Sequence, residues 1–460
     1  MKEENFYSRL LVTTDLPTYD HTNLTDSKKR PGGGSDVGYI EDIDGQPTIV
    51  KGGVGSLLIA QAIVENAHKN NLDGNIDTTC ENLARDLGLD TRDKKIIELQ
   101  ENLKKVWNNK EFQTKITGVL NKVREKDAQW DSMDKAITPQ DVSFVQEKLY
   151  EAAKSLDIDI SALSVTTNFG IINQASSQHL VNKFLESQDK EAAPAQIIAS
   201  NKSLYLGSQL LPKENGIEPL DKKVISFFDG VKEGKKTKEQ AKEDLKSYLT
   251  KIDGLFSATF LRLVLGEGAD NNLDNSLVTA SGQVIPIDIT GNRGDRKDNK
   301  TLNDRKTKEP FTEYGYSAVI GALSDRDELL NILLDKTVFK DRYAQKDDEL
   351  HKHVVEAIKE VAGDKAVSEV SSAVEWLASL DDEKISKDFQ ELVSGVNERL
   401  SDSRKMPDDL AKTATERVVE KFIKAPIAAC KEYLKVRTTV AEVGIEKEKE
   451  KEKTEHKVAL

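Results

Sequence analysis

The chain has 460 residues, of which 37% are hydrophobic and 32% are charged, so it can form two or three domains around at least one large core. Its net charge of -13 argues against a nucleic-acid partner, because phosphate backbones favour clustered positive charge. Apolar runs stay below about eighteen residues, so the sequence predicts no transmembrane helix. The N-terminus also lacks the apolar stretch of a cleavable signal peptide.

Cysteine usage indicates the working compartment. Cys80 and Cys430 lie far apart, in stretches with helical periodicity. Two thiols provide neither a disulfide framework nor a zinc site. We therefore expect reduced core residues and a cytosolic compartment.

The N-terminal part begins with a polar stretch, 1–30, that we expect to be a flexible leader. Two β-rich runs follow at 37–40 and 48–51, separated by an Asp-Gly dipeptide. Asp-Gly between such runs is a strong signal for a tight hairpin. Residues 55–160 then show the helical spacing of apolar residues, with a helix start at Pro139.

The middle of the chain returns to strands after a further predicted helix at 173–188. Two short runs, 196–199 and 203–206, are typical of a second strand pair. Residues 213–243 are charged and rich in lysine. Residues 244–265 have the pattern of one amphipathic helix.

The C-terminal half opens with a predicted loop, strand, tight turn and strand at 270–291, followed by a polar loop. Residues 313–437 are predicted to be helical. The helical stretch should break at three positions that disfavour a helix: Gly363, Pro407 and Pro426. The last residues, 446–460, form a charged Glu-Lys tail.

Three polar side chains around the predicted 270–291 hairpin have a spacing that suits phosphoryl transfer. Asp270 and Asn275 are five residues apart in one loop, and Asp288 follows the second strand. The reaction needs a carboxylate to orient the acceptor hydroxyl, and oxygen ligands to hold Mg²⁺ against the phosphates. The alternative interpretation is an Asx-rich surface turn. A carboxylate after the apolar run 284–287 favours the functional interpretation, because an unpaired buried charge is costly.

This layout resembles the catalytic and metal-binding loops of the phosphoinositide-kinase-like and atypical protein kinases. Those families carry an Asp-x-His-x-x-Asn loop followed by an Ile-Asp-x-Gly strand end. Here Asn272 stands where the histidine would be, and one extra residue precedes Gly291. The resemblance implies that Asp270 is the catalytic residue. It also implies that Asn275 and Asp288 bind Mg²⁺, with Mn²⁺ as an alternative metal.

The same resemblance implies an α+β fold with two kinase-like lobes. The N-lobe would cover 31–212 and contain a large helical insertion at about 55–170. The C-lobe would cover 213–400. A helical C-terminal region at 401–445 would precede the charged tail.

The ATP-binding residues implied by the resemblance come from the two strand pairs: Gly33, Gly34, Ser35, Lys51, Gln209 and Leu211. Backbone N–H groups of the first three could face the phosphates, and the lysine would contact the α and β phosphates. The last two fall where a hinge would contact adenine. The alternative interpretations are a linker for the glycines and a snorkelling surface lysine.

The residue that pairs with Lys51 is open between two segments. Glu65 follows the lysine on a predicted helix, where a solvated helix face is the alternative. Gln174 or Gln178 lies in the helix directly before the second strand pair, where the family has its regulatory helix. On that interpretation a neutral amide replaces the usual glutamate.

A dense set of lysines suggests a polyphosphate ligand, with a solvated surface as the alternative interpretation. The set comprises Lys222, Lys223, Lys232, Lys235, Lys236, Lys238 and Lys242. The expected ligand is an inositol polyphosphate or a phosphoinositide headgroup.

The Glu-Lys tail resembles the C-terminal signal of effectors exported by type IV secretion systems of intracellular bacteria. Together the resemblances predict a secreted effector kinase that uses ATP and Mg²⁺ on a host protein or phosphoinositide, activated by a host inositol polyphosphate. It would reach the host cytoplasm by a non-Sec route and could act peripherally at host membranes. The alternatives are a phosphoinositide lipid kinase, favoured by the basic residues within 291–312, and a nucleotide-binding pseudokinase, favoured by Asn272 and the shifted Gly291.

Overall fold

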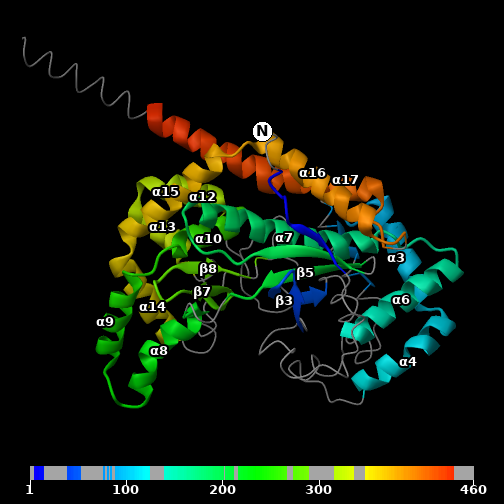
Figure 1. Cartoon of the computed structure of the whole chain (residues 1–460), viewed down its shortest axis with the longest axis horizontal. Coiled ribbons are helices and arrows are strands. Elements are labelled where there is room, and N and C mark those ends of the chain that lie inside the picture. The colour runs from blue at the N-terminus through cyan, green and yellow to red at the C-terminus, as the bar shows by residue number, and fades with distance from the viewer. Residues whose placement is uncertain are drawn as a thin grey trace, which may run out of the picture.

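The protein combines two sheets with long helices, so the α+β fold class predicted from the sequence is confirmed (Figure 1). The two-lobed arrangement stays a prediction. The computed structural model describes residues 5–14, 39–52, 76–77, 80–81, 83–84, 87, 89–124, 139–200, 203–211, 216–266, 273–287, 289, 315–335, 348–402 and 404–439.

The first sheet contains the hairpin that the Asp-Gly dipeptide predicts. Strands β2 (Tyr39–Ile43) and β3 (Gln46–Gly52) are antiparallel, with Tyr39 opposite Val50. Asp44 and Gly45 join them with φ values of 52° and 81°. Positive φ at both central residues is what a tight type I′ turn requires, and Asp-Gly adopts it readily. The predicted hairpin is confirmed.

The second predicted strand pair is also confirmed and completes the same sheet. Strands β4 (Ala195–Ser200) and β5 (Ser203–Gln209) are antiparallel, and β3 pairs with β5. The strand order is β1-β4-β5-β3-β2. The first strand, β1 (Leu11–Thr13), is the one parallel neighbour within this order.

Strand β1 corrects the expectation of a flexible leader for residues 5–14. Tyr7 and Leu10 are buried, and β1 pairs with Ile197–Ala199 of β4. The first 30 residues are polar and mixed as a whole, and the mainly apolar stretch that docks, 6–12, is short. The parallel partner lies far away in the sequence.

Helix α7 (Leu163–Ser187) packs against β4 and β5 and crosses behind the sheet in Figure 1. The sequence predicts a helix at 173–188, but α7 begins at Leu163. Its surface is buried on nearly all sides, including polar residues such as Ser176, Gln178 and Asn182. A helix buried all round has no regular polar face, so periodicity marks its start poorly.

Helices also form most of the described part of the predicted insertion. They are α3 (Lys94–Trp107), α4 (Lys110–Arg124) and α6 (Pro139–Ser155). Proline is the first residue of α6, as the sequence predicts, because a first-turn position needs no N–H donor. These helices share one hydrophobic core with the C-terminal helices α16 (Asp382–Arg399) and α17 (Asp408–Val418).

The second hydrophobic core surrounds the smaller sheet, whose order is β6-β7-β8. Its strands are β6 (Glu218–Pro219), β7 (Ser276–Val278) and β8 (Val284–Pro286). The helices around it are α8 (Leu220–Lys232), α9 (Lys238–Leu249), α10 (Leu255–Val264), α12 (Tyr316–Gly321), α13 (Arg326–Leu333), α14 (Asp348–Val361) and α15 (Gly363–Ser379). Short 3-10 turns occupy Leu273–Asn275 and Ala322–Ser324.

The prediction of one amphipathic helix at 244–265 is wrong. Two helices, α9 and α10, occupy this stretch and are separated by 250–254, where Gly254, the residue before α10, has a φ of 94°. All ten residues of α10 are buried, so it has no solvent-facing side. The apolar residues of α9 and α10 together imitate a continuous stripe in the sequence.

Two of the three predicted helix breaks are confirmed. Helix α15 begins at Gly363, and Pro407 stands at the N-cap of α17. Pro426 does not break its helix, because the chain stays helical over 425–439. A π-helical turn at Val419–Lys424 directly precedes it, and such widened turns accommodate a missing backbone donor. Within the described part of the chain, every helix is too short or too polar to cross a membrane.

Candidate functional site

The β7–β8 hairpin carries the predicted metal-binding segment, and its predicted strand-turn-strand form is confirmed. Ser276 pairs with Pro286, and Val278 pairs with Val284. Gly282 closes the turn with a φ of 92°. A Cβ atom at this position would lie 2.5 Å from the Lys251 carbonyl oxygen, so only glycine fits both the conformation and the space.

The open end of this hairpin brings the predicted metal-binding residue Asn275 beside Ile287, the residue before position 288. The N–H of Ile287 donates to the carbonyl of Asn275, with an N···O distance of 2.8 Å. Position 288 is therefore next to a residue directly bonded to Asn275. The side chains of Asp270 and Asp288 lie outside the described residues, so their predicted roles stay predictions.

A buried arginine is hydrogen-bonded to the same end of the hairpin. Arg262, on α10, is 0% exposed. Its Nη2 donates to the carbonyls of Asn275 (2.8 Å) and Ile287 (2.7 Å). Burial of a guanidinium is tolerated only where hydrogen bonds and charge compensate for the lost water. One nitrogen atom thus bonds both strands at the point where they lead into the predicted site.

Helix α7 reaches the site through Gln178. Its Nε2 donates to the Pro286 carbonyl (3.0 Å) and to Asn182 Oδ1 (3.1 Å). Its Oε1 accepts from the N–H of Ile289 (3.4 Å). Of the three candidates for the lysine partner, Gln178 thus faces the backbone on both sides of position 288. Gln174 is buried in the same helix, and Glu65 lies outside the described residues.

The predicted nucleotide-binding residues of the first sheet lie on neighbouring strands. The backbone of Lys51 on β3 pairs with Leu206 on β5, and Gln209 at the end of β5 pairs with Thr48. Leu211 follows two residues later and is half-buried. The N–H of Leu210 donates to the Pro47 carbonyl (2.8 Å), which ties this segment to β3. The predicted loop residues Gly33, Gly34 and Ser35 lie outside the described part.

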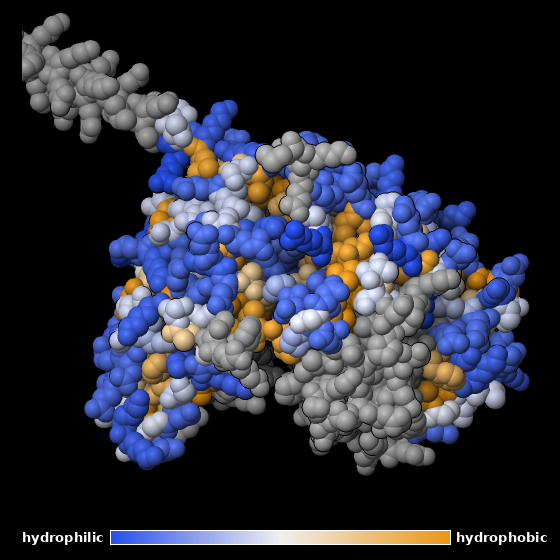
Figure 2. Space-filling model, viewed as in Figure 1, coloured by the Kyte–Doolittle hydropathy of each residue, from blue (hydrophilic) through white to orange (hydrophobic). Residues whose placement is uncertain are grey.

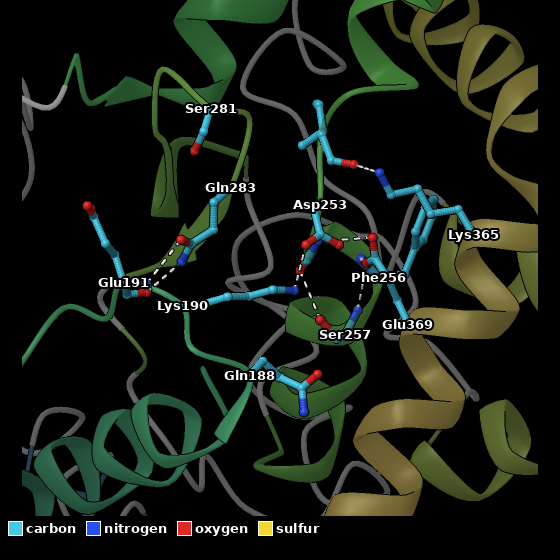
Figure 3. Close-up of polar contacts among 12 residues, drawn as sticks. Gln188, Lys190, Glu191, Asp253, Phe256, Ser257, Ser281, Gln283, Lys365 and Glu369 are labelled. Atoms are coloured by element: carbon cyan, nitrogen blue, oxygen red, sulfur yellow. Dashed lines mark hydrogen bonds and ion pairs between the residues drawn. The ribbon is translucent and has the colours of Figure 1, made fainter. Parts of the chain in front are cut away.

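The start of α10 depends on a carboxylate from another helix (Figure 3). Glu369 of α15 is 8% exposed and accepts from the N–H groups of Gly254 (2.9 Å), Phe256 (2.8 Å) and Ser257 (3.4 Å). Burial raises the pKa of the Glu369 carboxyl, and the three backbone donors oppose that rise. The N–H groups at a helix start favour an anion, so Glu369 replaces a cap that α10 lacks.

Asp253, directly before Gly254, makes further contacts at the same helix start. Its N–H donates to the Gly282 carbonyl (2.9 Å), and its carbonyl accepts from the N–H of Val284 (2.8 Å). Its carboxylate pairs with Lys190 at 2.7 Å. Burial opposes ionisation of Asp253, but the bond and charge of Lys190 outweigh it and lower its pKa. Helix α10 is therefore attached to the hairpin at both ends, through Asp253 and through Arg262.

Arg262 and Glu369 are site residues that the pattern analysis missed, although the sequence holds a signal for each. Arg262 is the charged residue in the otherwise uncharged run of α10, Leu255–Val264. Glu369 falls in the buried stripe of α15, between Ala366 and Val370. A charged residue at a core position indicates a buried partner, because an uncompensated charge there is costly.

The lysine set that predicts a polyphosphate ligand is extensively paired with carboxylates. Lys223 bonds Glu218 (2.8 Å), and Lys236 bonds Asp244 (2.9 Å). Two further members are also paired, Lys235 with Glu233 and Lys242 with Glu356 and Glu360. Figure 2 shows the hydrophilic surface over α8 and α9, where these residues lie. Pairing compensates these charges, so the geometry gives the phosphate interpretation no added support.

Comparison with protein-family models, with curated proteins and with solved structures finds no match for this chain. Among the described residues, no group of three His, Cys, Asp or Glu side chains could hold a metal ion. What the site offers is an amide side chain at Asn275, a backbone fixed beside position 288, and a lysine-bearing strand in the neighbouring sheet.

Proposed function

We propose that the protein is an ATP- and Mg²⁺-dependent phosphotransferase with a kinase-like arrangement of its site. The observation that carries the proposal is the open end of the β7–β8 hairpin. There the 2.8 Å bond between Ile287 and Asn275 brings an amide ligand beside a carboxylate position. A tight hairpin gives that proximity whatever its function, and the kinase-like spacing of Asp270, Asn275 and Asp288 is what gives it a metal-binding interpretation.

The order of elements supports the proposal. A lysine strand, β3, is followed in the chain by helix α7 and by the strand pair β4 and β5. The expected catalytic Asp270 follows helix α10 in the sequence, and the β7–β8 hairpin comes after it. In the kinase-like fold that the resemblance implies, the lysine strand, regulatory helix, catalytic loop and metal strand occur in this order.

The donor set fits magnesium. Asn275 and Asp288 would supply amide and carboxylate oxygens, the hard ligands that Mg²⁺ prefers. Arg262 bonds the backbone carbonyls of Asn275 and of Ile287, the residue before Asp288. Bound there with ATP, the ion would neutralise charge on the phosphates. Asp270 would orient the acceptor hydroxyl, and Lys51 would contact the α and β phosphates.

Binding and transfer of the γ-phosphoryl group test the proposal together. The chain should be stabilised in thermal unfolding by ATP with Mg²⁺, and it should transfer label from [γ-³²P]ATP when host-cell extract is supplied. Asp288→Ala and Asn275→Ala should each reduce transfer by at least about 100-fold. Asn331→Ala, an exposed asparagine on α13, is the matched control and should behave like wild type. Metal-dependent transfer that survives Asp288→Ala would contradict the assignment.

A second candidate is a nucleotide-binding module without turnover. The observation that favours it is Gln178, whose two amide hydrogens serve Pro286 and Asn182. A neutral, engaged amide does not supply the carboxylate that positions the lysine in active kinases. Stabilisation by ATP and Mg²⁺ without any label transfer would decide for this candidate.

The host-directed part of the function rests on the sequence resemblance alone. The Glu-Lys tail and the basic loop that favours a lipid substrate both lie outside the described residues. We propose a host protein or phosphoinositide as the acceptor. Transfer to purified phosphatidylinositol vesicles, against transfer to extract proteins, separates the two substrates.

A further inference from the structure

The segment around position 288 is held by two buried side chains from different helices. Gln178 of α7 bonds the backbone of Pro286 and Ile289, and Arg262 of α10 bonds the backbone of Ile287 and Asn275. Their exposed fractions are 5% and 0%. Every described residue from 286 to 289 therefore has a backbone atom bonded to one of these two side chains.

The two side chains constrain different parts of the open end of the hairpin. Arg262 joins the two strands through one nitrogen, so it fixes how far Asn275 lies from the residue before position 288. Gln178 spans position 288 itself, since it bonds the carbonyl two residues earlier and the N–H one residue later. The described backbone on each side of position 288 is therefore bonded to the same side chain.

We propose that Gln178 and Arg262 are positioning residues that set the separation and orientation of the metal ligands Asn275 and Asp288. The inference rests on the proposed function, because it treats these two residues as ligands. Neither positioning residue needs to touch metal or nucleotide. Their effect is exerted through the backbone of 286–289.

The chemistry of the contacts explains why position 178 carries glutamine. Its side chain must donate to a carbonyl, at Pro286, and accept from an N–H group, at Ile289. An amide does both, whereas an ionised glutamate only accepts and would repel the Pro286 carbonyl. This pair of contacts therefore requires an amide at position 178, so the glutamine has a role of its own and is not simply a replacement for the kinase glutamate.

The substitution Gln178→Glu separates the two roles of this residue. If Gln178 replaces a lysine-pairing glutamate, the carboxylate should improve ATP binding and transfer. If Gln178 positions the backbone, Gln178→Glu and Gln178→Ala should both raise the Mg²⁺ concentration for half-maximal ATP binding, by about 10–100-fold. Glu186→Gln, at an exposed position of the same helix, is the control and should leave that concentration unchanged.

Hydrogen exchange tests the contact without any ligand. The N–H of Ile289 bonds Gln178, so its peptide should exchange about tenfold faster in Gln178→Ala than in wild type or Glu186→Gln. Arg262→Lys should likewise raise the Mg²⁺ concentration for half-maximal ATP binding, since the shorter lysine lacks the Nη2 atom that bonds both carbonyls. If Arg262→Lys fails to fold, the Gln178 variants still decide the question.

The outcomes of these experiments distinguish the positioning role from the proposed phosphotransferase function. Unchanged exchange at Ile289 in Gln178→Ala, or stronger ATP binding by Gln178→Glu, overturns the positioning role and leaves the proposed function standing. A wild-type chain that binds no ATP with Mg²⁺ overturns the proposed function and the positioning role together. Faster exchange combined with a raised Mg²⁺ requirement in both Gln178 variants supports both.

Discussion

Helices α9 and α10 are neighbours in the sequence and differ in how their ends are stabilised. Helix α9 starts with a capping box, in which Thr237 and Gln240 exchange side-chain and backbone hydrogen bonds. Helix α10 starts at Gly254, which has no side chain to offer, and takes its cap from Glu369, more than one hundred residues later. One helix carries its start signal beside it, and the other receives it from α15.

The two helices also differ in what surrounds them. Helix α9 buries Ala241, Leu245 and Leu249 and keeps an outer face that bonds α14 through Lys242 and Lys246. Helix α10 is buried on every side and carries Arg262 toward the candidate site. Neighbouring residues in the sequence therefore stabilise the start of the partly exposed helix α9, whereas distant side chains stabilise α10, the helix that supports the candidate site. Four measurements test this contrast.

The largest effect is expected from Phe260→Ala. Phe260 is 0% exposed at the centre of α10, so truncation should lower the free energy of unfolding by about 4 kcal/mol, from lost burial and a residual cavity. The half-buried Phe227 of α8 provides the control, and Phe227→Ala should cost clearly less. Urea unfolding followed by fluorescence or circular dichroism measures both. Equal losses of unfolding free energy in the two variants would contradict a larger contribution from the fully buried helix α10.

The next largest effect is expected from Glu369→Ala. It leaves three N–H groups at the start of α10 without their acceptor, which should cost about 2–3 kcal/mol. Glu375→Ala, at an exposed position of the same helix, should change the free energy of unfolding by less than about 0.5 kcal/mol. A loss as small as that of Glu375→Ala would show that α10 does not depend on this distant cap.

A smaller effect is expected at the start of α9. Thr237→Ala removes the capping hydroxyl and should cost about 1 kcal/mol. Thr237→Ser keeps the hydroxyl and should restore most of the stability, which makes it the matched control. Urea unfolding measures both variants. A loss equal to that of Glu369→Ala would remove the contrast between the two helices.

The smallest effect is a pH dependence at Glu369. Burial raises the pKa of this carboxyl in the folded chain, so the folded state binds more protons than the unfolded state above the ordinary glutamate pKa of about 4.3. Stability from this group is present at low pH and is lost as pH rises through the raised pKa. Wild type should therefore gain stability relative to Glu369→Gln as the pH falls from 7 toward the ordinary glutamate pKa. A relative loss over that interval would contradict the raised pKa.

The sequence predicts those parts of the fold whose signals are local. The Asp44-Gly45 turn, the strand pair β4 and β5, and the start of α6 at Pro139 each depend on residues within a few positions. The division between α9 and α10 is hidden in the sequence, because the apolar residues of the two helices form one continuous stripe although Asp253-Gly254 is a local turn signal. The docking of residues 5–14 could not be predicted, because its partner strand β4 lies far away in the sequence.

The candidate site divides in the same way. The spacing of Asn275 from the second strand predicts their proximity, since a tight hairpin returns the chain to its start. The contacts of Gln178 and Arg262 could not be predicted, because a polar side chain in a helix does not reveal which distant backbone it meets. The spacing therefore indicates the ligand positions, while the packed helices determine their support.

Docking of the N-terminal segment has a consequence for synthesis of the chain. Phe6 donates its N–H to Asp388 of α16 (2.7 Å), 382 residues later, and its carbonyl bonds His179 (2.8 Å). Strand β1 covers the outer edge of β4. On the ribosome these first residues must wait until α16 has emerged before all their contacts can form. Strand β1 can pair with β4 once β4 has emerged, but until α16 follows this edge strand lacks the Asp388 contact that helps to hold it, and a loosely held sheet edge favours pairing with other chains.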